Sequence, residues 1–316
     1  MIFERKKLLE DLGGIEEPVV KNKEWLYLLE EETRNSIMIE GFFVDNKELK
    51  EVLSRSSNLT RSQKEAFNYF STAKFVYGLG YQNYRENEFE LTIPLIRQIN
   101  KELGGEGEFR KGSITITGSK IEPPEFNLKE WVQLFVEYVK KSFSLNEEQF
   151  ISALCVSHAF FEEIHPFEDG NGRTGRILLN YILISKGFPL VIIKGLKSNK
   201  EKYYSALEEI DKQHLKLFSE YKTKIPEKEF ALKILNDTNP KSLKRIIESS
   251  LRESIDRMII GKLLNKGEKL VPVSELLKQL GYKEGSHRKL IERGKIIAVK
   301  EKNTWFSTEN IFDMFL

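Results

Sequence analysis

The chain has 316 residues, of which 31% are charged, and its net charge at pH 7 is +2. This near balance excludes a chain that binds polyanions over its whole surface, and it also excludes a disordered chain. A single cysteine, no apolar run of membrane-spanning length and no signal-peptide stretch at the N-terminus together predict a cytoplasmic protein without disulfides.

The first informative element is an amphipathic helix predicted over residues 24–40. Gly41 follows it and is well suited to end a helix. Ser36 and Glu40 are four residues apart, so they share one face of this helix. Further helices are predicted at 46–53, 60–76 and 93–103, the last with Pro94 in its first turn.

An isolated β segment is predicted between Gly112 and Gly118. Apolar β-branched residues alternate there with hydroxyl residues, in the order Ser113, Ile114, Thr115, Ile116, Thr117. This pattern indicates a short strand or one arm of a hairpin. In an otherwise helical chain such a strand has an unpaired edge, to which a partner strand could add.

The richest motif lies between two buried helices. An apolar helix is predicted over 151–164 and a second one from about residue 171 to 184, with a loop after His165 because Pro166 disfavours a helical conformation there. Gly170, Asn171 and Gly172 therefore lie at a helix N-terminus. Free amides and the helix dipole attract an anion at such a position, and glycine lets the backbone come close to a phosphate.

Charged side chains complete this loop. Arg173 and Arg176 are three residues apart on one helix face and could bind the same polyphosphate. Asp169 suits Mg²⁺, which prefers one or two carboxylates together with phosphate oxygens. His165 is a candidate base for a hydroxyl nucleophile. Transfer of part of a nucleotide requires all of these parts.

The segment from His165 to Arg176 resembles the signature of the Fic (Fic/Doc) family: His, any residue, Phe, any residue, an acidic residue, Gly-Asn-Gly-Arg, two residues and Arg. Every fixed position is filled. The resemblance implies that His165 deprotonates a Ser, Thr or Tyr hydroxyl of a target protein or of the chain itself, and that Asp169 holds Mg²⁺. It also implies that the loop binds the phosphates of ATP through the following residues: Gly170, Asn171, Gly172, Arg173, Thr174, Gly175 and Arg176. AMP would then pass to the hydroxyl.

Other segments resemble further parts of that family. Residues 113–117 are similar to its flap, which docks the target segment. Tyr203 and Tyr204 are similar to its adenine-contacting segment, whereas Asp211 falls near a position where related proteins often carry Asn.

Ser36 to Gly41 resembles the inhibitory motif of N-terminally autoinhibited members. The resemblance implies that Glu40 pairs with Arg176 and holds ATP in a non-productive pose. Removal of AMP remains open as an alternative, as does phosphate transfer, although the phosphate-transferring branch carries Lys where this chain has Gly172.

The C-terminal part is predicted to be a separate module. Two short helices, 273–280 and 286–293, are joined by a turn at 281–285, and strands at 296–299 and 304–306 could form a wing. This order resembles a winged helix-turn-helix. Basic residues that could meet DNA phosphates are Arg288, Lys289, Arg293, Lys295, Lys300 and Lys302.

The predicted fold is therefore mainly α: a Fic-type helical core with a small β-hairpin flap and a winged-helix module. The expected domains are an N-terminal helical region over 1–84, a catalytic core over 85–225 and the C-terminal domain over 240–316. A homodimer is possible. An alternative from another class is a DNA-bound regulator that senses nucleotide without turnover.

Overall fold

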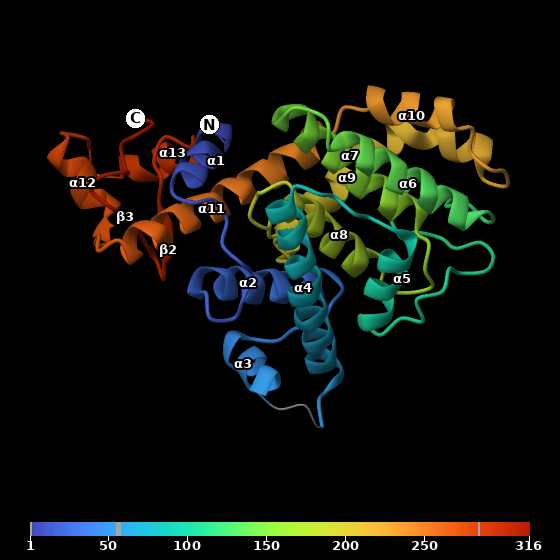
Figure 1. Cartoon of the computed structure of the whole chain (residues 1–316), viewed down its shortest axis with the longest axis horizontal. Coiled ribbons are helices and arrows are strands. Elements are labelled where there is room, and N and C mark those ends of the chain that lie inside the picture. Colours follow the sequence, from blue (N-terminus) through green and yellow to red (C-terminus); the bar gives the residue numbers. More distant parts are fainter. Residues whose placement is uncertain (1, 55–57, 284) are drawn as a thin grey trace.

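The structure, a computed structural model, describes residues 2–54, 58–283 and 285–316, and within these ranges helices dominate (Figure 1). One residue of the predicted turn at 281–285 lies outside them. The N-terminal helices are α1 (Ile2–Asp11), α2 (Lys23–Ile39), α3 (Asn46–Ser54), α4 (Arg61–Glu86) and α5 (Ile93–Glu102). The central helices are α6 (Leu128–Ser142), α7 (Glu147–Ile164), α8 (Asn171–Ser185), α9 (Lys197–Tyr221), α10 (Lys228–Asp237) and α11 (Lys241–Asn265). None of the described helices is both long and apolar enough to cross a membrane.

Local signals in the sequence set several helix ends. Thr60 caps α4 in a reciprocal arrangement with Gln63, and Thr92 caps α5, which has proline in its first turn. The helix predicted over 24–40 begins at Lys23 and ends at Ile39, with Glu40 as its C-cap residue. The helix predicted over 60–76 continues to Glu86, because its buried face packs along α8.

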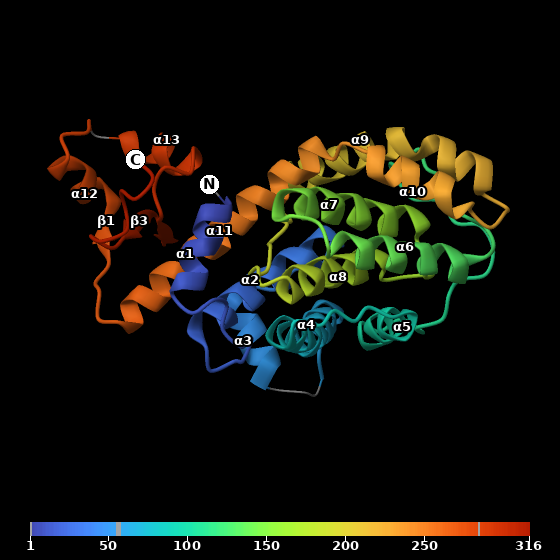
Figure 2. The same ribbon diagram turned by 45° about the horizontal axis from the view of Figure 1, so that its top comes forward.

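The core is layered. Helix α8 is buried along its whole length and packs between α7 on one side and α4 and α5 on the other. Helices α6 and α9 pack on α7, and α10 packs on α9, as the turned view shows (Figure 2). Every side chain of α8 except that of Gly172 is buried, which fits the apolar run that predicted this helix. The burial of α8 fixes its N-terminus, and the loop before it, in one place.

The C-terminal module is small and has its own apolar cluster. It contains β1 (Val271–Pro272), α12 (Val273–Gln279), α13 (Ser286–Glu292), β2 (Val299–Glu301) and β3 (Thr304–Ser307). The sheet is antiparallel in the order β1-β3-β2, with Val271 opposite Ser307 and Val299 opposite Phe306. The strand predicted at 296–299 is displaced toward the C-terminus, because Ile296, Ile297 and Ala298 are buried before the ladder begins.

Two predicted features differ from the structure. Residues 113–117 form no strand or hairpin: their apolar side chains are half-buried and their hydroxyl side chains exposed, as in an edge strand, but no described strand pairs with them. The domain limits also differ. The limit at 84/85 falls inside α4, which packs on α8, and α11, which follows the predicted limit near 240, packs against the core helices α7 and α9. The module with its own cluster begins near Val271.

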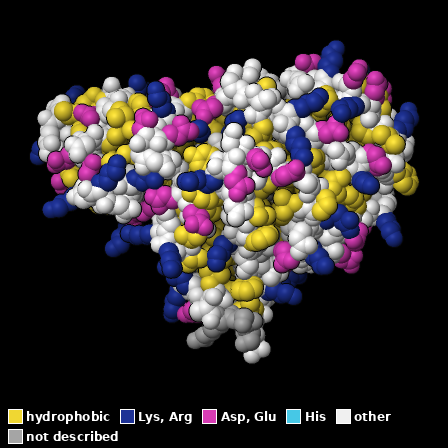
Figure 3. Space-filling model, viewed as in Figure 1, with side chains coloured by type: hydrophobic (Ala, Val, Ile, Leu, Met, Phe, Trp, Pro, Cys, Tyr) yellow, Lys and Arg dark blue, Asp and Glu magenta, His cyan; other side chains and the backbone are white. Residues whose placement is uncertain are grey.

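Positive and negative side chains are interspersed on the face of the molecule seen in Figure 3.

Candidate active site

His165 lies at the C-terminal end of α7 and faces a cleft of about 440 Å³. Its backbone is left-handed, with φ of 48°, because Pro166 prevents the helix from continuing. Its Nδ1 lies 3.0 Å from the carbonyl oxygen of Glu162. A carbonyl only accepts, so Nδ1 carries the proton and Nε2 keeps a free lone pair. Burial of the ring lowers the pKa of His165 below its usual value, so at neutral pH the side chain is a base.

Arg110 holds the turn that carries His165. Its Nε donates to the carbonyl oxygen of His165 at 2.7 Å, and Nη2 donates to those of Pro124 at 2.7 Å and Ile164 at 3.3 Å. Its Nη1 donates to the carbonyl oxygen of Gly112, at the start of the flap segment. One buried guanidinium therefore joins the turn at His165 to the predicted flap. The sequence reasoning assigned no role to Arg110, because a single arginine before a β segment carries no spacing signal.

The loop after His165 closes on itself and starts α8. The side chain of Asn171 accepts from the backbone N–H of Phe167 at 2.9 Å and donates to its carbonyl oxygen at 2.7 Å. Gly170 caps the helix with φ of 80°, a conformation that glycine adopts without strain. Gly170, Asn171 and Gly172 line the cleft, as predicted. Both polar atoms of the Asn171 side chain bond the Phe167 backbone and shape the loop, and the free backbone amides of the helix N-terminus are available to an anion.

The next three predicted phosphate-binding residues do not line the cleft. Arg173 is buried and donates to Asp169 Oδ2 at 2.9 Å and to Glu65. Thr174 is wholly buried, and Gly175 lies against α7, where an added Cβ would come 3.2 Å from the Phe161 ring. Thr174 and Gly175 therefore serve the packing of α8 on α7, whereas Arg173 fixes the carboxylate of Asp169.

Asp169 is the candidate magnesium ligand. Its side chain is 84% exposed and lines the cleft beside the free amides of α8. Among the described residues no group of three or more His, Cys, Asp or Glu side chains could hold a metal by itself. A single carboxylate next to an anion site still fits Mg²⁺, which takes much of its coordination from phosphate oxygens and water.

Arg176 is held by the helix that carries the predicted inhibitory motif. Its Nε donates to Ser36 Oγ at 2.6 Å, and its Nη2 donates to Glu40 Oε1 at 2.6 Å and to the Ser36 carbonyl oxygen at 3.1 Å. The Glu40 side chain is 31% exposed, whereas that of Arg176 is 4% exposed. Gly172 leaves room for this pair, because an added Cβ there would lie 2.6 Å from Glu40 Oε1. The structure thus brings together residues 140 positions apart.

The far end of the cleft is formed by α9 and the flap. Tyr203 is buried and its hydroxyl lies 2.7 Å from His158 Nε2, while Tyr204 is 45% exposed. Asp211 accepts a hydrogen bond from Ser119, just beyond the flap. All three predicted base-contacting residues line the cleft, as do Ile116 and Thr117 of the flap.

Several further residues of the cleft were missed by the sequence reasoning, and three of them make notable contacts or are strongly affected by burial. Glu162 and Glu163 are acidic residues on α7, and burial raises the pKa of each to about 7. Glu163 Oε2 lies 2.6 Å from His214 Nδ1. Lys200 donates to the carbonyl oxygen of Ile39, at the end of α2. Nothing in the spacing of charged residues along α7 and α9 distinguishes these three from the other charged residues of the same helices.

Comparison with known proteins agrees with this geometry. The sequence model of the Fic/DOC family matches residues 90–183. A protein from Aquifex aeolicus named probable protein adenylyltransferase is 30% identical over 287 residues, which cover 88% of this chain and 84% of that protein. The protein adenylyltransferase Fic of Drosophila willistoni is 32% identical over 127 residues, which cover 38% of this chain and 25% of that protein.

Solved structures show the same fold. A Fic-domain-containing signalling protein from Bacteroides thetaiotaomicron superposes with a TM-score of 0.61 at 19% identity, over 85% of this chain and 97% of the other. A Fic family protein from Desulfovibrio desulfuricans gives a TM-score of 0.50 at 18% identity, over 97% of this chain and 92% of the other.

Proposed function

The chain belongs to the Fic/DOC family, and we propose that it transfers AMP from ATP to a hydroxyl side chain of a protein, itself included, under inhibition by Glu40. The observation that carries this proposal is the position of Arg176. Arg176 lines the cleft that His165 faces, near the N-terminus of α8, and its guanidinium forms an ion pair with the carboxylate of Glu40.

The chemistry follows from the free nitrogen of His165. Nε2 takes the proton from the target hydroxyl while the Nδ1–H bond to the Glu162 carbonyl keeps the ring in place. The hydroxyl oxygen then bonds to the α-phosphorus of ATP, the bond from that phosphorus to the bridging oxygen breaks, and pyrophosphate leaves. The amides of α8 at Asn171 and Gly172 bind phosphate oxygens and stabilise the charge that develops there. When Mg²⁺ is bound, Asp169 would hold it, and the ion would neutralise phosphate charge.

The flap segment supports a protein substrate. Residues 113–116 lie in no described helix or strand, Thr117 begins a turn, and Ile116 and Thr117 line the cleft. A target segment could add alongside these residues as a strand, which would bring its hydroxyl to His165. Main-chain bonds of this kind accept many sequences.

Inhibition follows from the sharing of Arg176. Glu40 and Ser36 use Nε and Nη2 of the guanidinium, and the Glu40 carboxylate repels the terminal phosphate of ATP from the same side chain. Removing a charge from a pair that is mostly buried costs several kcal/mol, on the order of 3–5 in buried cases and less here because Glu40 is partly exposed. Phosphate transfer is disfavoured because the phosphate-transferring branch carries Lys where this chain has Gly172. A side chain at this position would collide with the pair of Glu40 and Arg176.

The test compares three proteins with Mg²⁺ and ATP: the parent, Glu40→Gly, and Glu40→Gly combined with His165→Ala. Intact mass spectrometry measures the addition of AMP, with radioactive ATP and a cell lysate as a second target source. We expect label with the single variant alone. No label with Glu40→Gly on any protein would refute AMP transfer. Label with both variants would refute the role of His165, and release of AMP by the parent from labelled protein would establish the reverse reaction.

A second candidate function, DNA binding, rests on the C-terminal module. Its helices α12 and α13 and strands β2 and β3 follow the order of a winged helix. The six basic residues predicted to meet phosphates are all exposed: Arg288, Lys289, Arg293, Lys295, Lys300 and Lys302. Binding of duplex DNA that weakens steeply with added salt would support this function, and no binding at low salt would exclude it.

A further inference from the structure

The inhibitory helix α2 is fixed at both of its ends. Its C-terminal end carries Ser36 and Glu40, which hold Arg176, and Lys200 donates to the carbonyl oxygen of Ile39. Its N-terminal end lies about 25 Å away, because a helix rises about 1.5 Å per residue over its 17 residues. Between its two ends the helix packs on α4 and α8, and its continuous backbone hydrogen bonds join the ends in one element.

The anchor at the N-terminal end is Arg257 on α11. Its Nη1 donates to Glu24 Oε2 of α2 at 3.1 Å, and its Nη2 donates to Glu301 Oε1 of β2 at 3.3 Å. The guanidinium also lies 3.7 Å above the ring of Tyr27, one turn along α2. Its side chain is only 11% exposed. One arginine therefore contacts the inhibitory helix and the wing of the C-terminal module at once.

Helix α11 is suited to connect these parts. It runs from the catalytic core to the C-terminal module and contacts both α2 and β2 (Figure 1). It approaches α2 closely at Gly261, where an added Cβ would lie 2.6 Å from Glu24 Cγ. The Glu24 side chain of α2 therefore lies directly against the backbone of α11 at this point.

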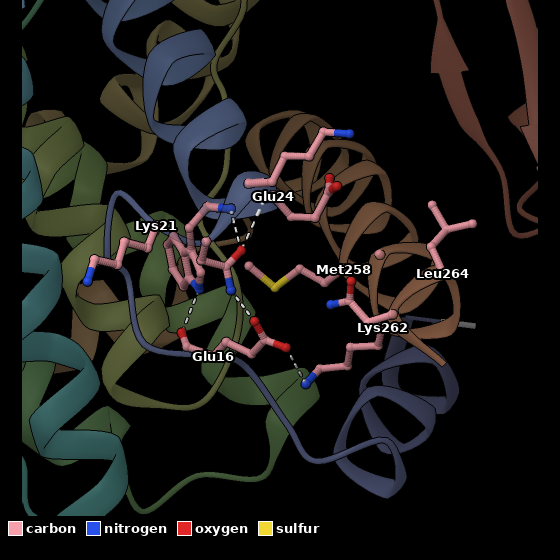
Figure 4. A pocket seen from close by; sticks show the side chains of 11 residues that line it. Glu16, Lys21, Glu24, Met258, Lys262 and Leu264 are labelled. Atoms are coloured by element: carbon pink, nitrogen blue, oxygen red, sulfur yellow. Dashed lines mark hydrogen bonds and ion pairs between the residues drawn. The ribbon is translucent and has the colours of Figure 1, made fainter. Parts of the chain in front are cut away.

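A cleft beside the anchor leaves the end of α2 room to move. It has a volume of about 370 Å³ and is lined by residues of α11, of the N-terminus of α2 and of the segment before it (Figure 4). Lys262 reaches across it to Glu16 at 3.1 Å, and the side chains of Glu24 and Met258 border it. The N-terminal end of α2 therefore has open space and polar contacts on the side of this cleft, while Trp25 and Leu28 are packed into the core.

We propose that Arg257 couples the wing strand β2 to the inhibitory helix, so that the position of the C-terminal module sets how firmly Glu40 holds Arg176. This inference rests on the proposed inhibition by Glu40. Glu301 orients the guanidinium toward Glu24 and over Tyr27. When the wing shifts, Arg257 loses this orientation, the N-terminal end of α2 tilts into the cleft, and the pair of Glu40 with Arg176 opens more often.

The test uses the full chain with three variants and one control. Arg257→Met removes the anchor, Glu301→Gln removes only its orientation by the wing, and Gly261→Ala pushes α2 away without removing a charge. The control is Glu253→Gln, also on α11. It breaks the exposed ion pair of Glu253 with Lys194, whose N–O distance is 2.9 Å and which does not involve α2. Each change is made in the parent and in the Glu40→Gly background, and AMP transfer is measured.

In the parent we expect Arg257→Met to raise AMP transfer about two- to fivefold, since an ion pair of this kind contributes up to about 1 kcal/mol, and Gly261→Ala to raise it similarly by displacing Glu24. Glu301→Gln should raise it about twofold, and the control should not change it. In the Glu40→Gly background none of these changes should raise it further. An unchanged rate for Arg257→Met in the parent, when the Glu40→Gly protein is active, would overturn the coupling. An unchanged or lower rate for Glu301→Gln would overturn the role proposed for the wing strand.

Hydrogen exchange separates this inference from the proposed function. Arg257→Met should speed the exchange of backbone amides in residues 33–39 of α2, and Glu253→Gln should not. This result does not depend on activity. Equal exchange in both variants would refute the coupling even if AMP transfer is confirmed. Faster exchange in Arg257→Met, together with a Glu40→Gly protein that transfers no AMP, would support the coupling and refute the proposed reaction.

Discussion

Replacing Arg110 with Met should separate the positioning of His165 from the binding of ATP. The Arg110 guanidinium donates to four carbonyl oxygens, those of His165, Ile164, Pro124 and Gly112. Bonds to a charged donor contribute about 1.5–3 kcal/mol each, but part of this is offset by the burial of the charge, which also lowers the pKa of Arg110. We therefore expect the free energy of unfolding to fall by about 3 kcal/mol.

The effect on catalysis should be larger than the effect on stability suggests. The His165 turn has a left-handed backbone and is held through its own carbonyl oxygen, so loss of Arg110 lets the imidazole shift. A misplacement of about 1 Å can cost on the order of a hundredfold in rate. The cradle at Gly170 and Gly172 has its own support from Asn171, so the KM for ATP should change by less than about threefold while kcat falls about a hundredfold.

The assay is steady-state AMP transfer in the Glu40→Gly background at several ATP concentrations, with thermal unfolding measured in parallel. Arg97→Met is the matched control, because Arg97 Nε also donates to a loop carbonyl, that of Gly107, at 2.7 Å, but touches no part of the His165 turn. Arg110→Lys should recover part of kcat. If Arg110→Met and Arg97→Met lower kcat equally, or if Arg110→Met raises KM alone, the positioning argument is refuted.

Two further predictions concern buried titratable groups. Because burial lowers the pKa of His165, the rate of AMP transfer by Glu40→Gly should fall with a midpoint below pH 6.5, and a midpoint above 6.5 would contradict this. Burial raises the pKa of Glu32, on α2, from 4.5 to about 8, so between these values the folded chain holds a proton that the unfolded chain releases, and stability should fall as pH rises. Glu32→Gln should remove that loss, up to about 1.4 kcal/mol per pH unit, and urea unfolding at pH 5 and pH 8 that shows the same change in both proteins would refute it.

Local parts of the site could be predicted from the sequence. Pro166 ends α7 at His165, the glycines start α8, and the apolar run buries that helix, because each of these effects acts within a few residues. The face shared by Ser36 and Glu40 also follows from helical spacing alone. Family resemblance then indicated which distant arginine Glu40 would meet.

Contacts between distant segments required the tertiary structure. Periodicity describes which face of a helix is buried but not what lies opposite it, so the roles of Arg110 and Lys200 could not be predicted. The predicted flap shows that a local pattern can also predict too much. Residues 113–117 do alternate in exposure, but a strand needs a partner, and no described strand pairs with them.

The sequence by itself therefore determined the loop between α7 and α8, the mainly helical core, and the order of the two helices and two later strands in the C-terminal module, since these depend on neighbours along the chain. The tertiary structure decided where α4 and α11 belong, which side chains Arg176 and Arg257 contact, and which loop residues reach the cleft. These depend on how buried faces pack against one another, and many packings are compatible with one pattern of apolar residues.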